Sequence, residues 1–482
     1  MTSSAVTPAP SFAPPRERVW PLIFATAFGW WLAGAFQIFP LGWVALVPFW
    51  LLVLDRPRRQ RLRLGYLAGF VSFWLINWWL VPTITHGAAA IGASPLLGFV
   101  LSLVAVTFIA AVHACQPMLC ALLARGGRWF TPLLLASAWT GLDWLRDQGP
   151  LAHSWGALGF TQTSDLWVLR GSLGTGQHGL TFLCAFVSVC VALWWRERRP
   201  VFAAMPLALL VVWHGAGMIY RSRWALARPL RVLIVQTDVS SLGKNGGLGP
   251  FPQALEMTRR ACQNRRFDLI LWPETTMTLR KAGGFYAGID LATWQLYGPK
   301  IPLLAGARAT TPSGQEFNEA VLIAPDGSTQ SYAKTRLVPF GERPPFVEWL
   351  PFLAQFAPNP LIERGDGPHN LMLAANAPNA GAPNVSINPA ICFESCFPLS
   401  TAAARADFNA ILTNDEWFGW TEAPRQHRAM AQLRAIETGN PVLQSCNGRY
   451  SFLVAPDGKI EATTQGDAAQ TLEVTLGKKE KG

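Results

Sequence analysis

Three segments of the sequence place a reactive side chain directly after an expected strand or hairpin. Glu274 follows Trp272-Pro273, and because proline stops a strand, its carboxylate is expected at the strand tip, where functional groups often lie. Lys334 lies just after an expected hairpin, and Cys392 ends a strand-like run before a turn into a helix. An acid, an amine and a thiol suit nucleophilic catalysis through a covalent intermediate.

Each of these side chains has an expected role and an ordinary alternative. Partial burial would raise the pKa of Glu274 toward that of a general base, unless Glu274 only caps a helix. Lys334 could stabilise a thiolate or an oxyanion, or be a solvated surface lysine. A helix N-terminus and a nearby lysine would lower the pKa of the Cys392 thiol below its ordinary value of about 8.5; the alternative is a core cysteine.

Neighbouring residues supply further candidates. Glu342, in the motif VPFGE, adds a second carboxylate, with a structural ion pair as its alternative. The backbone N–H of Phe393 could form an oxyanion hole together with Lys334. Glu394 comes next, and Cys396 is expected to be buried packing.

The elements that must position these groups begin at Arg231. Short runs rich in Val, Ile and Leu, such as RVLIVQT, FDLILWPE and FNAILTND, predict buried strands. Asp-Gly turns at 324–328 and 455–459 predict hairpins, and Gln426–Thr438 has helical spacing. Strands that alternate with helices predict an α/β layered catalytic domain over residues 231–477.

The first half of the chain has the composition of a membrane protein. Half of all residues are hydrophobic and 14% are charged, below the ~25% typical of soluble domains. The hydrophobic residues concentrate before Tyr220, and the 22 tryptophans suit aromatic belts at membrane interfaces.

Two classes of partner are not expected. The net charge of +11 does not indicate nucleic acid, because many basic residues lie in short clusters beside apolar spans. The eight cysteines form no CxxC pair and no Cys/His cluster with zinc spacing, so neither a metal nor a cofactor is expected. A disulfide between Cys396 and Cys446 in an oxidising compartment stays open.

A bundle of about seven transmembrane helices is expected over residues 19–220. The candidate spans are Val19–Phe36, Ile38–Leu54, Leu64–Val81, Leu96–Leu123, the short and weaker Thr131–Leu145, Gly179–Trp195 and Val201–Ile219. A disordered cytoplasmic tail is expected at 1–18, a linker at 221–230 and a charged tail at 478–482.

Clusters of arginine predict the orientation of this bundle. With seven spans, the clusters at 56–63, 125–128 and 196–199 all fall on one side. An excess of Lys and Arg marks the cytoplasmic side, so the catalytic domain is expected outside the membrane. An even number of spans would reverse that orientation, so the weaker fifth span decides it.

Two further segments are expected at the membrane surface. Asp143 and Arg146, one helical turn apart, are either an interfacial ion pair or part of a headgroup pocket. The run FVEWLPFLAQF carries Phe346, Trp349 and Phe352 and either dips into lipid as a lid or forms an ordinary core helix.

Together, WPE, a lysine before LVPFGE and C-[FY]-E after a strand resemble the nitrilase superfamily, whose catalytic triad is Glu, Lys and Cys. The resemblance implies that Glu274 is the base, Lys334 the electrostatic stabiliser and Cys392 the nucleophile. Glu394 falls on the glutamate that follows the cysteine in that superfamily. The implied fold is an αββα sandwich.

Within that superfamily the chain resembles the membrane-bound apolipoprotein N-acyltransferases. The matching segments include LINWWLVPTITHGA, DWLRDQ, WGALGFTQT, LTNDEWFG and the helix QHRAMAQLRAIETGNPVL. The resemblance implies a phospholipid acyl donor, a thioester on the cysteine and an apolipoprotein whose N-terminal amine accepts the chain. It also implies the bacterial cytoplasmic (inner) membrane, with the catalytic domain on the periplasmic side.

Four features depart from that family. No spanning helix follows the catalytic domain, TDVSSLGKNGG replaces a GNIPQ-like segment, Phe393 replaces a tyrosine, and Cys446-Asn447-Gly448 replaces Asn-Thr-Gly. Nitrilase-like membrane proteins encoded with conjugal transfer systems share the plan and would use a different acceptor. An amidase or other hydrolase with the same triad, and a non-catalytic scaffold, are the remaining alternatives.

Overall fold

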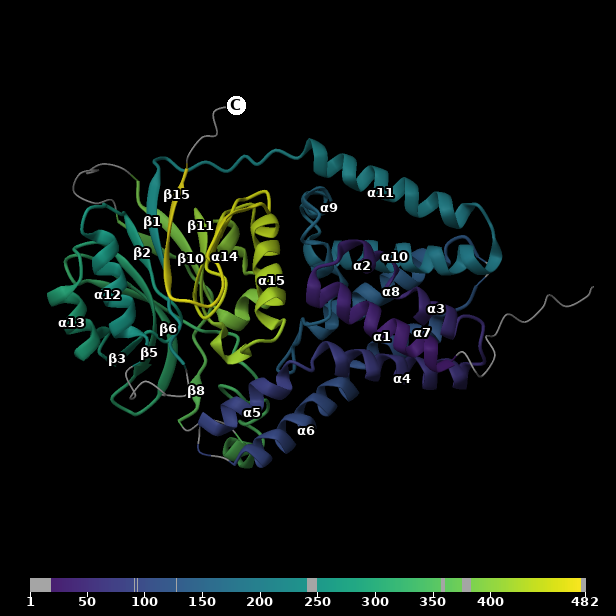
Figure 1. The fold of residues 1–482 in the computed structure, drawn as a ribbon, viewed down its shortest axis with the longest axis horizontal. Coiled ribbons are helices and arrows are strands. Elements are labelled where there is room, and N and C mark those ends of the chain that lie inside the picture. The colour runs from purple at the N-terminus through teal and green to yellow at the C-terminus, as the bar shows by residue number, and fades with distance from the viewer. Residues whose placement is uncertain are drawn as a thin grey trace, which may run out of the picture.

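A computed structural model describes residues 19–477 except 91, 93, 127, 241–248, 357–359 and 375–382. The tails expected at 1–18 and 478–482 lie outside the described residues. Figure 1 shows a bundle of helices beside a layered α/β domain, with helix α15 between them. Both expected parts of the fold class, the helical bundle and the layered domain, are therefore confirmed.

Helices cover the segments that hydropathy predicts as spans. Its helices are α1 (Val19–Phe36), α2 (Phe39–Val44), α3 (Val47–Val53), α4 (Arg58–Ile76), α5 (Leu80–Ala90), α6 (Pro95–His113), α7 (Cys115–Leu123), α8 (Thr131–Arg146), α9 (Leu166–Gly171), α10 (Gly176–Glu197) and α11 (Val201–Ile219). A short 3-10 turn, η2 (Leu158–Gln162), precedes α9. Two of these helices, α5 and α9, lie largely in segments expected as loops.

Several of the expected spans are interrupted. The span expected at Ile38–Leu54 is split into α2 and α3, because Pro48 in the first turn of α3 has no N–H to continue the helix from α2. Helix α4 begins six residues before the expected Leu64 and bends by 52° into α5. By length and composition, four described helices can cross a membrane, or five if α4 and α5 form one span. The number of seven stays a prediction.

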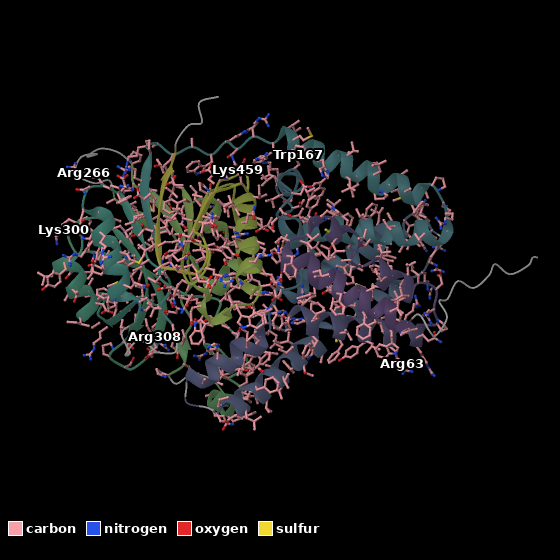
Figure 2. The ribbon with its side chains drawn as sticks, in the orientation of Figure 1. Arg63, Trp167, Arg266, Lys300, Arg308 and Lys459 are labelled. Carbon is pink, nitrogen blue, oxygen red and sulfur yellow. The ribbon has the colours of Figure 1, made fainter. Side chains whose placement is uncertain are left out.

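The three arginine clusters meet at one end of the bundle. Arg196 pairs with Asp55 at 2.9 Å, Arg61 donates to the backbone oxygen of Ala124 at 2.8 Å, and the backbone N–H of Gly126 donates to Asp55 at 3.0 Å. Figure 2 places Arg63 at the end of the bundle farthest from the α/β domain. This arrangement agrees with the expectation that the basic loops share one side; the side of the membrane they face stays a prediction.

The α/β domain contains two sheets. The larger has the order β15-β1-β2-β5-β3-β4, with β6 beside β5 and with β7 and β8 beside β6. Its strands are β1 (Leu230–Gln236), β2 (Leu269–Leu271), β3 (Met277–Ala282), β4 (Phe285–Ala287), β5 (Leu303–Thr310), β6 (Glu316–Ile323), β7 (Thr329–Ala333), β8 (Ile362–Glu363) and β15 (Gln470–Leu476).

The smaller sheet has the order β14-β13-β12-β11-β10-β9. Its strands are β9 (Leu371–Leu373), β10 (Val385–Ile391), β11 (Phe408–Asn414), β12 (Val442–Asn447), β13 (Phe452–Val454) and β14 (Ile460–Thr463). Both predicted Asp-Gly hairpins are present, as the β6–β7 and β13–β14 pairs.

Helices cover the outer faces of the two sheets. Alternate residues of β1 point to opposite faces, so Val232 packs between the sheets with Phe408 of β11, whereas Leu233 packs outward against α12 (Phe251–Cys262) and α13 (Ile289–Tyr297). The second sheet is covered by α15 (Ala423–Thr438), near the short α14 (Thr401–Ala404). This is the expected αββα sandwich.

Helix α15 joins the sandwich to the bundle. It begins three residues before the predicted Gln426. Its Gln432 donates to the backbone oxygen of Thr163 at 3.1 Å, and its Arg434 donates to Gln177 of α10 at 2.9 Å. One helix therefore contacts both the second sheet and the bundle.

Candidate active site

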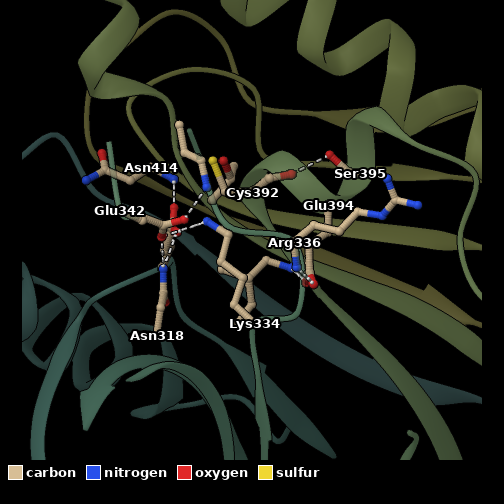
Figure 3. Close-up of polar contacts among 12 residues, drawn as sticks. Asn318, Lys334, Arg336, Glu342, Cys392, Glu394, Ser395 and Asn414 are labelled. Carbon is tan, nitrogen blue, oxygen red and sulfur yellow. Dashed lines mark hydrogen bonds and ion pairs between the residues drawn. The ribbon is translucent and has the colours of Figure 1, made fainter. Parts of the chain in front are cut away.

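The structure brings the three expected catalytic side chains together, each within three residues of a strand end. Figure 3 labels two of them, Lys334 and Cys392. Glu274 follows β2, Lys334 follows β7, and Cys392 follows β10 at the start of the 3-10 turn η5 (Cys392–Cys396). The Lys334 Nζ lies 3.2 Å from Glu274 Oε1. The Cys392 thiol interacts electrostatically with both of these groups.

Glu274 is buried and held from two sides. Its Oε1 accepts a hydrogen bond from Asn318 at 2.7 Å, and its Oε2 accepts one from the backbone N–H of Asn414 at 3.0 Å. Gly306 of β5 allows this approach, because a Cβ there would lie 2.4 Å from the Glu274 Cα. The carboxylate is therefore fixed in one position.

Lys334 is a buried ammonium shared by two carboxylates. Its side chain is 1% exposed and its Nζ lies 2.9 Å from Glu342 as well as beside Glu274. Burial opposes the charge, but the two carboxylates outweigh it and raise the pKa of Lys334 well above its ordinary value. A solvated surface lysine is excluded. Glu342 forms an ion pair, and its second oxygen accepts the backbone N–H of Val338 at 2.8 Å.

The expected lowering of the Cys392 pKa is wrong for this structure. Burial and the nearby charge of Glu274 raise the pKa of the thiol well above its ordinary value, and the opposing effect of Lys334 is smaller. The thiol therefore keeps its proton at neutral pH and needs a base to remove it. Cys392 also has a φ of +49°, a conformation that non-glycine residues rarely adopt.

Glu394 ties the segment before the cysteine to the segment after the lysine. Its Oε1 accepts hydrogen bonds from the Tyr332 hydroxyl at 2.7 Å and from the backbone N–H groups of Thr335 and Arg336 at 2.8 and 3.1 Å. Its Oε2 accepts the backbone N–H of Ile391 at 2.8 Å. Glu394 therefore fixes the spacing between the lysine and the nucleophile.

Two asparagines of this site were not singled out in the sequence. Asn318 donates hydrogen bonds to both Glu274 and Glu342. The sequence feature that could have indicated it is a polar amide within the mostly apolar strand EFNEAVLI. Asn414 contributes its backbone N–H, which no side-chain pattern reveals.

Among the described residues, no group of three or more His, Cys, Asp or Glu side chains is arranged to hold a metal. Cys396 and Cys446 are both buried, and each is a free cysteine, so no disulfide joins them in this structure.

The site lies on the side of the sandwich that faces the bundle. Phe393 and Phe418 pack with Trp79 and Trp155 of the first half of the chain. The backbone oxygen of Asp147 accepts a hydrogen bond from Arg336 at 3.2 Å. The turn η5, which carries Cys392 and is called the nucleophile turn below, is therefore in contact with residues that flank membrane helices.

The two segments expected at the membrane surface have defined structures. Asp143 and Arg146 form a buried ion pair at 2.6 Å; its position at the membrane interface and the alternative of a headgroup pocket stay predictions. The run that contains Trp349 and Phe352 is not a core helix: it forms turns and the 3-10 turn η3 (Pro351–Phe356), and these two rings are 78% and 60% exposed. Its contact with lipid stays a prediction.

Two family models match the chain. The model of the apolipoprotein N-acyltransferase N-terminal domain matches residues 22–190, and the carbon-nitrogen hydrolase model matches residues 249–479. The protein is thus a carbon-nitrogen hydrolase domain, of the nitrilase superfamily, joined to a bundle of membrane helices. Because both models apply along one chain, it belongs to the apolipoprotein N-acyltransferase family.

Individual relatives agree with this membership along nearly the whole chain. The apolipoprotein N-acyltransferase of Chlorobaculum tepidum is 27% identical, with 92% of this chain and 86% of the relative covered. That of Geobacter metallireducens is 28% identical, again with 92% and 86% covered. A solved CN-hydrolase superfamily protein from Xanthomonas campestris is 18% identical, with 52% of this chain and 90% of that chain covered and a TM-score of 0.37.

Proposed function

We propose that this protein is a membrane-bound N-acyltransferase that moves an acyl chain from a phospholipid, through a thioester on Cys392, to the N-terminal amine of an apolipoprotein. One observation carries the proposal: a buried base, a buried ammonium and a half-buried thiol meet in one site beside the ends of membrane helices. The family membership supplies the donor and the acceptor.

In the first half-reaction the thiol attacks an ester carbonyl of the phospholipid. Glu274 accepts the thiol proton, which the raised pKa of Cys392 makes necessary. A sulfur–carbon bond forms and the carbon–oxygen ester bond breaks. The proton passes from Glu274 to the departing oxygen, and a lysophospholipid leaves. Lys334 and the backbone N–H of Phe393 stabilise the oxyanion of the tetrahedral intermediate.

In the second half-reaction the neutral N-terminal amine of the apolipoprotein attacks the thioester. A nitrogen–carbon bond forms, the carbon–sulfur bond breaks, and the proton released by the amine returns the sulfur to a thiol by way of Glu274. The buried ammonium of Lys334 is present in both half-reactions, so the same site serves attack by sulfur and by nitrogen.

The protein is proposed to lie in the bacterial inner membrane with the sandwich on the periplasmic side. The basic loops at 56–63, 125–128 and 196–199 gather at the far end of the bundle from the sandwich. An excess of arginine marks the cytoplasmic side, so the opposite end, with the catalytic site, faces the periplasm.

The test is mass spectrometry of the purified protein incubated with phospholipid in detergent. The expected result is a gain of one acyl chain on Cys392, its absence in Cys392→Ala, and its retention in Cys396→Ala. An amine-bearing diacylglyceryl peptide should then remove the chain and become acylated. Release of free fatty acid without any amine would instead support a hydrolase, and a thioester that this peptide does not discharge would support a different acceptor, as in the conjugal transfer proteins.

A further inference from the structure

A second polar group lies directly behind the nucleophile. Ser395, Asp415 and His427 are buried and come from three elements: η5, the 3-10 turn η6 (Asp415–Phe418) and α15. The Ser395 Oγ donates to the backbone oxygen of Cys392 at 2.8 Å (Figure 3). His427 Nε2 lies 2.8 Å from Ser395 Oγ and 3.2 Å from the same Cys392 oxygen.

The partners of His427 assign a proton to each ring nitrogen. Nδ1 faces both carboxylate oxygens of Asp415, at 2.9 and 3.2 Å, and a carboxylate only accepts. Nε2 faces the Cys392 carbonyl, which also only accepts. Burial opposes a charged ring, but Asp415 outweighs it and raises the pKa of His427 well above its ordinary value. The ring is therefore an imidazolium that donates to Asp415 on one side and toward the nucleophile's backbone on the other.

The orientation of the Cys392 carbonyl has a consequence for catalysis. This carbonyl and the N–H of Phe393 belong to one planar trans peptide group, so they point in opposite directions. Ser395 and His427 hold the oxygen on the α15 side. The N–H therefore points within the same plane in the opposite direction, away from α15. Because a φ of +49° is unfavourable for a cysteine, the turn needs such contacts to persist.

We propose that His427, held by Asp415, is a positioning residue that locks the Cys392–Phe393 peptide and so aims the Phe393 N–H at the oxyanion. Ser395 shares this role. The inference rests on the proposed function, because it concerns the oxyanion hole of the acyl transfer from phospholipid. Donation by a charged ring also polarises the peptide group and strengthens its N–H as a donor.

The bundle supports the imidazolium from its other face. Trp155, in the loop after α8, stacks on the His427 ring with 6.3 Å between ring centroids, and Phe418 meets that ring edge-on at 6.2 Å. His153 stacks on the same indole at 5.9 Å, but no hydrogen bond joins it to the nucleophile turn. The ring is thereby confined between the bundle and the nucleophile turn.

The test compares two reactions of Cys392 that differ in their need for an oxyanion hole. Acylation by phosphatidylethanolamine in detergent forms an oxyanion, whereas alkylation by iodoacetamide is a displacement at a saturated carbon and forms none. His427→Asn keeps a donor near Asp415 but cannot reach the Cys392 carbonyl. Acylation by this variant should fall by about 10²-fold or more, the loss expected when an oxyanion-hole donor is misplaced. Alkylation should stay within about two-fold of wild type.

Three further variants complete the experiment. His427→Gln extends an amide N–H to the place of Nε2 and should recover about ten-fold of the lost rate. Ser395→Ala should lower acylation, but not alkylation, and serves if His427→Asn does not fold. His153→Gln changes a half-buried histidine that stacks on the same tryptophan; it is the matched control and should acylate at the wild-type rate.

Equal loss of acylation and alkylation in His427→Asn and Ser395→Ala would overturn the positioning role, since a disordered turn would slow both. Unchanged acylation in both variants would also overturn it, while leaving the proposed function intact. If the wild-type protein forms no acyl thioester at all, the proposed function itself fails and takes this inference with it.

Discussion

Two clusters of buried charge, one in the active site and one at the end of α8, differ in their balance of positive and negative groups. In the active site one ammonium, Lys334, faces two carboxylates, Glu274 and Glu342. At the end of α8 the guanidinium of Arg146 faces one carboxylate, Asp143, at 2.6 Å and also donates to a backbone oxygen at 2.7 Å. The first cluster carries a surplus negative charge, whereas the second is neutral as a pair.

The difference separates a reactive site from a structural one. Because the active site has one more carboxylate than ammonium groups, a carboxylate can accept the proton of the Cys392 thiol. The ammonium of Lys334 limits the repulsion between Glu274 and Glu342. The pair at the end of α8 has no such surplus. Next to it, Asp147 accepts from Ser154 at 2.7 Å and from the Gln177 amide, and Gln177 in turn bonds Arg434 of the sandwich. That network fixes the bundle to the sandwich.

The largest expected effect comes from removing the shared ammonium. Lys334→Met leaves Glu274 and Glu342 buried side by side with no cation, so stability should fall by about 3–5 kcal/mol. The rate of thioester formation should fall by at least about 10³-fold in the folded fraction, because an oxyanion donor is lost. Intact-protein mass spectrometry and thermal unfolding in detergent measure the two losses.

The matched control for this variant is Lys281→Met. Lys281 pairs with the buried carboxylate of Glu319 at 2.8 Å in the same sheet, away from the thiol. Its loss should lower stability and leave the acylation rate of the folded protein unchanged. Acylation at the wild-type rate by Lys334→Met would remove the distinction between the two clusters.

The next largest effect tests the surplus carboxylate itself. Glu274→Gln can still accept the backbone N–H of Asn414, but it cannot take a proton from Cys392. Acylation should therefore fall by about 10²–10⁴-fold, the usual contribution of a general base. Glu319→Gln, a change of the same kind at a buried carboxylate outside the site, should leave acylation unchanged. Pre-steady-state acylation rates of the two variants would show the contrast, and equal losses would contradict it.

A smaller effect on stability is expected at the junction, with a distinct dependence on pH. Burial, and then the nearby Asp143, raise the pKa of Asp147 to about 7. An acid whose pKa is raised in the folded state binds its proton more tightly there, so its contribution to stability is complete below about pH 4 and is lost as pH rises toward about 7. Asp147→Asn keeps only one acceptor oxygen, so it loses one of the two hydrogen bonds from Ser154 and Gln177, but it cannot ionise and should flatten this decline. Unfolding temperatures between pH 4 and pH 8 measure it; a variant profile as steep as that of wild type would contradict the assignment.

The sequence predicted those parts of the molecule that depend on short segments. Glu274 and Cys392 each follow an apolar strand, and Lys334 follows a predicted hairpin, all inside recognisable motifs, so their meeting at the strand ends was foreseeable. The αββα layers followed from the alternation of strands and helices, and α15 from its spacing. The local sequence pattern was sufficient for every feature that depends only on where a residue lies within one strand or helix.

The rest depends on contacts between distant segments. The pKa of Cys392 was predicted in the wrong direction, because its burial and its distance from Glu274 are properties of the packed core. Asn318 and His427 join the site from β6 and α15, and neither stands in a motif that marks it as a partner of the nucleophile. The break before α3 was visible in the sequence as Pro48, but the apolar run around it masked the signal.

The smallest expected effect comes from a charge pair that is not buried. Arg170 of α9 lies 2.6 Å from Asp457 in the β13–β14 turn and, like the network around Asp147, joins the bundle to the sandwich. Both side chains are roughly one quarter exposed, so solvent screens the attraction, and Arg170→Ala should cost at most about 1 kcal/mol. A double-mutant cycle with Asp457→Ala, read by thermal unfolding, isolates the pair. A coupling energy well above about 1 kcal/mol would contradict the prediction. It would mean that exposed charge pairs, and not only buried ones, hold the bundle and the sandwich together.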